Sequence, residues 1–201
     1  MRDGVSARDD ILRDVRRAVG EARRPVDVPR DYRRERVVEA ATVDLFAERV
    51  ADYRAEVVRC SLDEVEARIA AALPPHAQVV VPDGLPWAVP GAVPDDRLTP
   101  AHLDGLDGVV TGATVGIAET GTIVLSHGPG EGRRAITLVP DLHVCVVRAD
   151  QVVAGVPDAI RLLDPTRPTT WISGPSATSD IELDRVEGVH GPRTLLVILA
   201  G

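Results

Sequence analysis

The chain has 201 residues, of which 44% are hydrophobic and only 2% aromatic, so we expect one core built from Val, Leu, Ile and Ala. The formal net charge is −8 at pH 7, and acidic residues interrupt every arginine run, which argues against nucleic acid or an acidic membrane as a partner. No apolar run approaches the roughly 20 residues that cross a bilayer, and the charged N-terminus does not resemble a secretory signal, so we expect a cytoplasmic protein without membrane insertion.

The residue types that are absent limit the chemistry. All 23 basic residues are arginine, which excludes a Schiff-base lysine and a Walker-type phosphate lysine. The two cysteines, Cys60 and Cys145, form no CxxC pair, and the five histidines show no metal-binding spacing. We therefore expect no cofactor, metal or iron–sulfur cluster in this chain, and redox chemistry would have to come from a partner.

The N-terminal part reads as helical. Apolar residues at Ile11, Val15 and Val19 have helical spacing and predict a helix over Ser6–Arg24. A second helix is predicted over Val37–Arg54, followed by a strand at Glu56–Cys60. We expect residues 1–55 to form a helical N-terminal extension and residues 56–201 to form an α/β domain.

Strands and helices alternate through the rest of the chain. A capping box at Ser61–Glu64 predicts a helix that runs to about Leu73, and Thr99-Pro100 predicts a short helix to Gly105. The remaining predicted segments are a strand at Gln78–Pro82, an irregular loop at Asp83–Arg97, strands at Asp107–Thr111 and within Gly116–Ser126, strands at Ala135–Pro140 and Leu142–Arg148, a helix at Gln151–Leu163, and strands at Thr169–Ser173 and Arg193–Ala200. This order predicts an α/β fold with a mostly parallel central sheet flanked by helices. Buried strands are expected at residues 79–81, 109–111, 144–147, 170–172 and 195–199.

The segment Ile117–Thr122 places Glu119 among apolar, Gly and Thr residues. Glu119 could be a catalytic base or nucleophile with a raised pKa, next to the binding groups Thr120 and Gly121. The alternative is a structural carboxylate paired with Arg133 or Arg134. Arg134 could equally clamp a carboxylate, or form a solvated pair with Arg133.

A second polar cluster follows the strand that ends at Ser173. Gly174, Ser176 and Thr178 are expected at a helix start, where backbone N–H groups bind anions, although the same residues serve as ordinary helix caps. His190 lies between glycines, either as a second catalytic group or as part of a plain turn. We expect these residues to meet Glu119, Thr120 and Arg134 in one cleft at the carboxyl ends of the strands.

Several separated motifs resemble the lactate utilization protein C family, the LUD domain family. They are IAETGT at Ile117–Thr122, Arg134 before Leu138-Val139-Pro140 and His143, GPS at Gly174–Ser176 with Thr178 and Asp180–Glu182, and GVHGP at Gly188–Pro192. The family often has a basic residue after GPS, and this chain has Ala177.

The resemblance implies a fold like the sugar-phosphate isomerases and coenzyme A transferases. It also implies a role as the cluster-free component of a three-component system that oxidises L-lactate to pyruvate, with iron–sulfur components as partners and a small carboxylate or phosphate as ligand. The alternative is a free-standing transferase or isomerase that acts on an acyl-coenzyme A or a sugar phosphate, with Glu119 as base or nucleophile.

Overall fold

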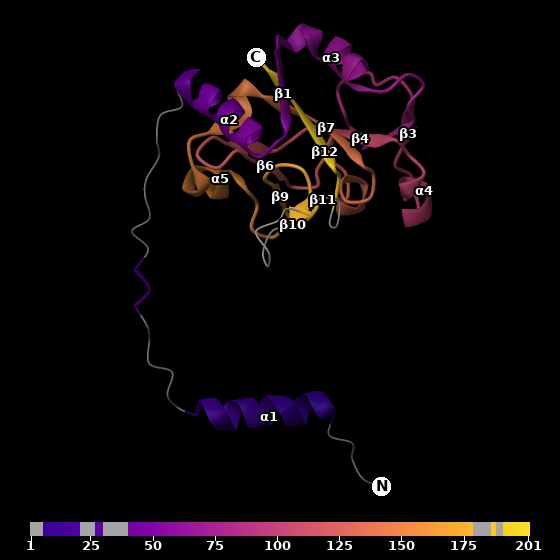
Figure 1. The fold of residues 1–201 in the computed structure, drawn as a ribbon. Helices are drawn as coiled ribbons and strands as arrows, with labels where there is room; N and C mark the ends of the chain where they lie inside the picture. Colours follow the sequence, from indigo (N-terminus) through magenta and orange to yellow (C-terminus); the bar gives the residue numbers. More distant parts are fainter. Residues whose placement is uncertain (1–5, 21–26, 30–39, 179–185, 188–190) are drawn as a thin grey trace. The chain divides into compact units, whose positions relative to one another are not determined.

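The computed structural model describes residues 6–20, 27–29, 40–178, 186–187 and 191–201. The chain divides into two compact units, Met1–Tyr32 and Arg33–Gly201. The first unit contains helix α1 (Ala7–Val19), which begins where the Ser6 side chain accepts a hydrogen bond from the backbone N–H of Asp9 and ends at Gly20. Figure 1 draws α1 in indigo near the N-terminus. No residue of α1 is buried, and its apolar side chains Ile11 and Val15 are exposed.

The second unit is built on a six-stranded sheet in the order β1-β12-β7-β4-β2-β3. The strands are β1 (Glu56–Cys60), β12 (Thr194–Ala200), β7 (Leu142–Arg148), β4 (Gly108–Thr111), β2 (Val79–Val81) and β3 (Ala92–Pro94). Every neighbouring pair is parallel, so the predicted α/β fold with a mostly parallel central sheet is confirmed. β3 lies inside the segment predicted to be an irregular loop and forms a short edge strand.

A second, four-stranded sheet has the order β8-β5-β6-β9. Its strands are β8 (Val152–Val153), β5 (Val115–Ile117), β6 (Thr122–Leu125) and β9 (Thr170–Ile172). One strand was predicted within Gly116–Ser126, but the segment forms an antiparallel hairpin, because Gly121 adopts a φ of +59° in the turn. The predicted helix Gln151–Leu163 shortens to α5 (Val156–Leu162), since Gly155 is extended and caps it.

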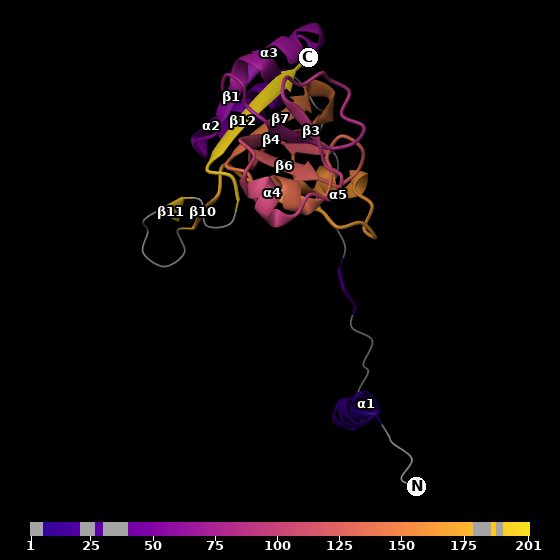
Figure 2. The ribbon, with the colours of Figure 1, turned by 90° about the vertical axis from the view of Figure 1, so that its right-hand side faces the viewer.

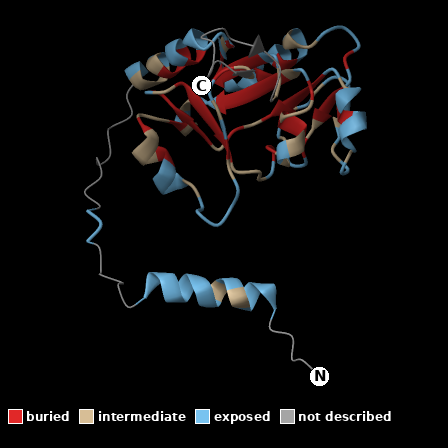
Figure 3. Ribbon diagram, turned by 60° about the horizontal axis from the view of Figure 1, so that its bottom comes forward, coloured by how far each residue is buried: buried red, intermediate tan, exposed pale blue. Residues whose placement is uncertain are grey.

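The two sheets pack face to face, with a helix on each outer side (Figure 2). Alternate residues of the parallel strands bury Val144, Val146 and Ile198 on the same side as Ile69 of α3 (Val65–Ala72). The opposite set of strand residues packs against β6 and α2 (Ala40–Asp52). α5 covers the far face of the second sheet through Ala159. Figure 3 shows that burial is concentrated in the strands between these layers.

Helix α2 belongs to the second unit by its packing. Its side chains Phe46, Ala47 and Val50 are buried together with Ile123 and Val197. A helical extension was predicted over residues 1–55, which includes α2. In the structure α2 lies in the compact unit Arg33–Gly201, which contains the two sheets.

Two predicted elements differ in the structure. Ala135–Pro140 was predicted as a strand, but a 3₁₀ turn, η2, covers Arg134–Thr137. Ile136 and Val139, three residues apart, face the same cluster as Leu103 of α4 (Pro100–Asp104), which is helical spacing rather than strand alternation.

The helix start expected at Ser176–Thr178 is wrong. Ala177–Thr178 (β10) pairs antiparallel with Val186–Glu187 (β11), so these described residues form a strand rather than a helix N-terminus that binds an anion. The expected strands at residues 109–111, 144–147 and 195–199 are confirmed as buried, and the strand at 79–81 is buried except for the half-buried Val81. Thr170–Ile172 is a strand too, but it lies at the edge of the second sheet and its Trp171 is 41% exposed.

Candidate functional site

A cavity of about 280 Å³ lies at the amino ends of β7 and β12. It is lined by Arg134, Thr137, Leu138, His143, Thr170, Trp171, Ile172, Ser173, Gly174, Pro175, Ser176, Gly191, Pro192 and Leu195. The sequence predicted a cleft at the carboxyl ends of the strands. The loop Ser173–Ser176 follows β9 of the second sheet. The position of β9 places this loop at the amino ends of the parallel strands, opposite to the predicted carboxyl ends.

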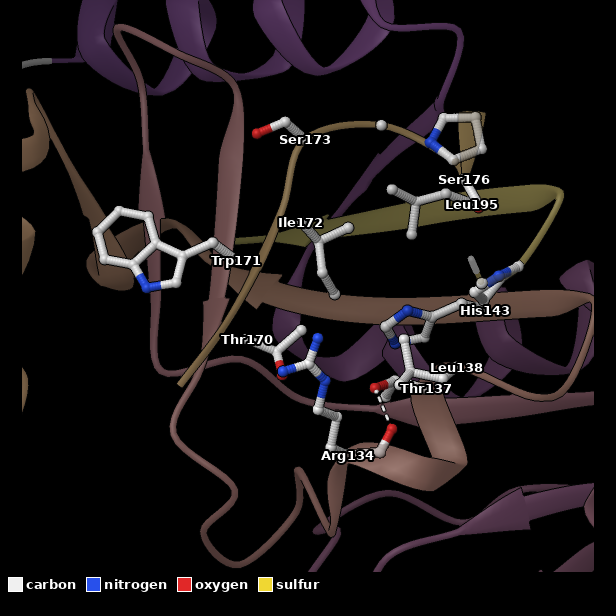
Figure 4. A pocket seen from close by; sticks show the side chains of 14 residues that line it. Arg134, Thr137, Leu138, His143, Thr170, Trp171, Ile172, Ser173, Ser176 and Leu195 are labelled. Atoms are coloured by element: carbon white, nitrogen blue, oxygen red, sulfur yellow. Dashed lines mark hydrogen bonds between the residues drawn. The ribbon is translucent and has the colours of Figure 1, made fainter. Parts of the chain in front are cut away.

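Arg134 supplies the positive charge of this cavity. It is the one permanently charged side chain among the described lining residues, and no carboxylate in the described part of the chain forms an ion pair with it. Figure 4 shows its guanidinium reaching from η2 towards Ile172, with Ser173 and Ser176 across the cavity. The cavity therefore offers a cation, and no described carboxylate on its wall competes for it.

The neighbouring Arg133 has a structural role instead. Its Nε and one terminal nitrogen each donate to a carboxylate oxygen of Asp95 at 2.7 Å. The same terminal nitrogen donates to the backbone oxygen of Leu98 at 2.6 Å. These hydrogen bonds hold the pKa of Asp95 below its usual value and tie η2 to the loop before α4.

His143 forms a buried wall of the cavity. Its Nε2 lies 2.8 Å from Oγ1 of Thr111, which donates to Sγ of Cys145 at 3.7 Å. The thiol in turn donates to the backbone oxygen of Gly112 at 3.6 Å. Burial lowers the pKa of His143 to about 4 and raises the pKa of Cys145 to about 12, so the imidazole is neutral and the thiol is protonated near pH 7.

Hydroxyl groups line the remaining polar wall. Thr170 bonds Nε2 of His127 at 2.9 Å, and Nδ1 of His127 donates to the backbone oxygen of Gly132 at 2.8 Å. Ser173 bonds the hydroxyl of Thr122 at 2.8 Å, which bonds Thr120 at 2.7 Å. Because Nδ1 of His127 carries the proton, Thr170 donates its hydroxyl proton to Nε2, so Ser173 rather than Thr170 is a potential donor to an anion.

The structure brings only part of the predicted site together. Arg134, Gly174 and Ser176 line the cavity, whereas Glu119, Thr120 and Gly121 do not. Thr120 reaches the cavity wall only through Thr122 and Ser173. Thr178 lies in β10, where its side chain is not described, and His190 lies outside the described residues.

Glu119 occupies the exposed turn between β5 and β6, where its backbone N–H donates to the oxygen of Ala154 at 3.1 Å. Gly121 and Gly174 allow close approach of helix α2 and the residue that follows it. A Cβ atom at Gly121 would lie 2.6 Å from the carbonyl carbon of Arg49, and one at Gly174 would lie 2.7 Å from the oxygen of Tyr53. These two glycines therefore shape the packing around α2.

Sequence reasoning did not select His143, Thr170 or Ser173 as site residues. A signal for His143 was present, because it is the one histidine within the apolar strand Leu142–Val147. No local pattern pointed to Thr170, since its role depends on where β9 ends in the second sheet.

None of the helices in the described residues combines the length and apolar character that a membrane crossing requires. Within the same part of the chain, no group of three or more His, Cys, Asp or Glu side chains is arranged to hold a metal ion.

The structure is a layered α/β body with a small cavity that contains a cation, and known proteins resemble it in sequence and in fold. Residues 99–200 match the family model described as the LUD domain. A lactate utilization protein C from Deinococcus radiodurans is 43% identical over 210 aligned positions, which cover 98% of this chain and 97% of the relative. The chain belongs to the LUD domain family, and the resemblance inferred from its motifs is confirmed.

Two further relatives agree with this assignment. A lactate utilization protein C from Halalkalibacterium halodurans is 34% identical over 91 residues, which cover 41% of this chain and 39% of that protein. A crystal structure of a DUF162 family protein from Deinococcus radiodurans superposes with a TM-score of 0.73 and 39% identity, covering 83% of this chain and 100% of that chain.

Proposed function

We propose that this protein acts in lactate utilization, binds a small carboxylate in the cavity beside Arg134, and works with an iron–sulfur component that carries out the redox chemistry. The observation that carries the proposal is the guanidinium of Arg134, which has no described carboxylate partner in a cavity lined by hydroxyls. The names of the relatives supply the metabolic context.

The chemistry of the cavity suits a small carboxylate. A guanidinium can donate two parallel hydrogen bonds to one carboxylate, and the hydroxyls of Ser173 and Ser176 are neutral polar groups on the other walls. A volume of about 280 Å³ lies at the lower limit for ligand pockets, which favours a ligand of a few heavy atoms over a nucleotide or a coenzyme A ester.

The binding proposal is tested by calorimetric titration with L-lactate and pyruvate. Arg134→Ala should lower affinity by about 30- to 150-fold, because a charge-assisted bidentate contact contributes about 2–3 kcal/mol, and should leave the melting temperature unchanged. Arg133→Ala is the matched control. It should lower the melting temperature, because Asp95 loses its partner, and keep the affinity. Unchanged binding by Arg134→Ala would refute the role of this cavity.

The partner proposal is tested separately by affinity purification from the native cell. An iron–sulfur protein should co-purify with the tagged full chain, and the isolated chain should turn over neither acyl-coenzyme A esters nor sugar phosphates. Turnover without a partner, abolished by Glu119→Gln, would instead support the free-standing transferase or isomerase.

A further inference from the structure

One ring nitrogen of His143 has no hydrogen-bond partner among the described residues. The residue is 1% exposed, and its hydrogen bond to the described part of the chain is made by Nε2. Among the described residues, Ser126 Oγ is the one fully enclosed side-chain N or O atom without a hydrogen bond. Nδ1 of His143 is therefore not sealed in the core, and the space it reaches is the cavity that His143 lines.

The contact between Nε2 of His143 and Thr111 fits either direction of donation, and we assign the imidazole proton from the hydrogen bonds behind it. The Cys145 thiol donates to the oxygen of Gly112 and accepts the hydroxyl proton of Thr111. Because that proton is used, Thr111 Oγ1 faces His143 as an acceptor, and Nε2–H of His143 is the donor. A neutral imidazole protonated at Nε2 presents a bare lone pair at Nδ1.

We propose that His143 selects 2-hydroxycarboxylates over 2-oxocarboxylates by accepting the hydrogen bond of the substrate 2-hydroxyl at Nδ1, while Arg134 binds the carboxylate. This inference rests on the proposed function, because it assigns the ligand class of the same cavity. Thr111 and Cys145 act as positioning residues, since they do not line the cavity and fix the tautomer of His143.

The discrimination follows from donor and acceptor chemistry. The hydroxyl of a 2-hydroxy acid can donate to Nδ1, whereas the carbonyl oxygen of a 2-oxo acid brings a second lone pair against it. A net hydrogen bond between neutral groups changes affinity by about 2- to 12-fold. L-lactate should therefore bind about tenfold more tightly than pyruvate, and propionate, which has no oxygen at C2, should not exceed lactate.

Cys145 provides a test that leaves the cavity wall intact. In Cys145→Ala the hydroxyl of Thr111 loses its acceptor and donates to Nε2 of His143, which moves the imidazole proton to Nδ1. The ratio of the affinity for lactate to the affinity for pyruvate should then fall from about ten to about one, or below one. Cys145→Ser keeps an acceptor and a donor at this position and should keep the preference. Melting temperatures of both variants separate this effect from loss of the fold.

The tautomer can be observed directly in the wild-type chain. Long-range ¹H–¹⁵N correlation spectra at pH 7 should show the His143 proton on Nε2, and on Nδ1 in Cys145→Ala. A wild-type proton on Nδ1, or equal affinities for lactate and pyruvate, would overturn the inference and leave the carboxylate site standing. If L-lactate, pyruvate and propionate all fail to bind, the proposed function fails with it.

Discussion

At the scale of single residues, His143 makes the stability of the protein depend on pH. Burial lowers its folded pKa from 6.5 to about 4, so the unfolded chain binds a proton that the folded chain excludes between these values. The contribution of this lowered pKa to the free energy of unfolding is fully present above pH 6.5. It is lost as the pH falls towards 4, by on the order of 3 kcal/mol.

Urea unfolding of wild type and His143→Gln at pH 7 and pH 4.5 measures this contribution. The difference between the free energies of unfolding of wild type and His143→Gln should be smaller at pH 4.5 than at pH 7, because glutamine does not titrate. The exposed His76→Gln serves as a surface control for the loss of a histidine. A constant difference for His143→Gln would show that the histidine titrates normally.

Arg133 and Arg134 have different roles that cannot be distinguished from the local sequence. Both follow the same glycine-rich loop, and nothing local distinguishes them. Their roles separate only when α4 and its preceding loop place Asp95 beside Arg133. Arg134 is left facing a cavity whose other walls come from β9 and the segment before β12.

At the scale of elements, α2 packs onto the second sheet through a glycine. The backbone of Gly121 has a φ of +59°, and an added Cβ would lie 2.6–2.8 Å from backbone atoms of Arg49 and Val50. Gly121→Ala should therefore destabilise the protein by about 2–4 kcal/mol, through the left-handed backbone and the displaced helix. Chemical denaturation measures the loss.

Gly105→Ala is the control for that substitution. Gly105 has a φ of −83°, and its nearest atom to an added Cβ lies at 3.5 Å, so the change should be close to neutral. Equal effects of the two substitutions would mean that α2 does not depend on the close approach at Gly121.

Elements set by local chemistry could be predicted from the sequence. The carboxylate of Glu64 accepts from the backbone N–H of Ser61, as the predicted capping box requires, and the apolar run Leu142–Arg148 is a strand buried from His143 to Val147. Elements set by distant contacts could not be predicted. Val152–Val153 carries no signal that separates it from α5, because it becomes a strand only by pairing with β5. The location of the cavity could not be predicted for the same reason, since it depends on β9, which places the loop Ser173–Ser176 at the amino ends of β7 and β12.

At the scale of the whole molecule, the first unit should be dispensable for folding. α1 has no buried residue, and the compact unit with both sheets begins at Arg33. A chain that starts at Arg33 should unfold within about 2 °C of the full chain and bind L-lactate with the same affinity. Calorimetry of both forms tests this, and a clear fall in melting temperature would show that residues 1–32 support the body.

The order of strands has a consequence for how the protein is made. β12 (Thr194–Ala200) lies between β1 and β7, so β1 finds its neighbour only when these residues have been synthesised. The emerging chain must hold the apolar residues of β1 without that neighbour until then, which lengthens its exposure to misfolding and to chaperones. A chain that stops before Thr194 would lack β12, and β1 would lose the strand through which it joins β7 and the rest of the sheet.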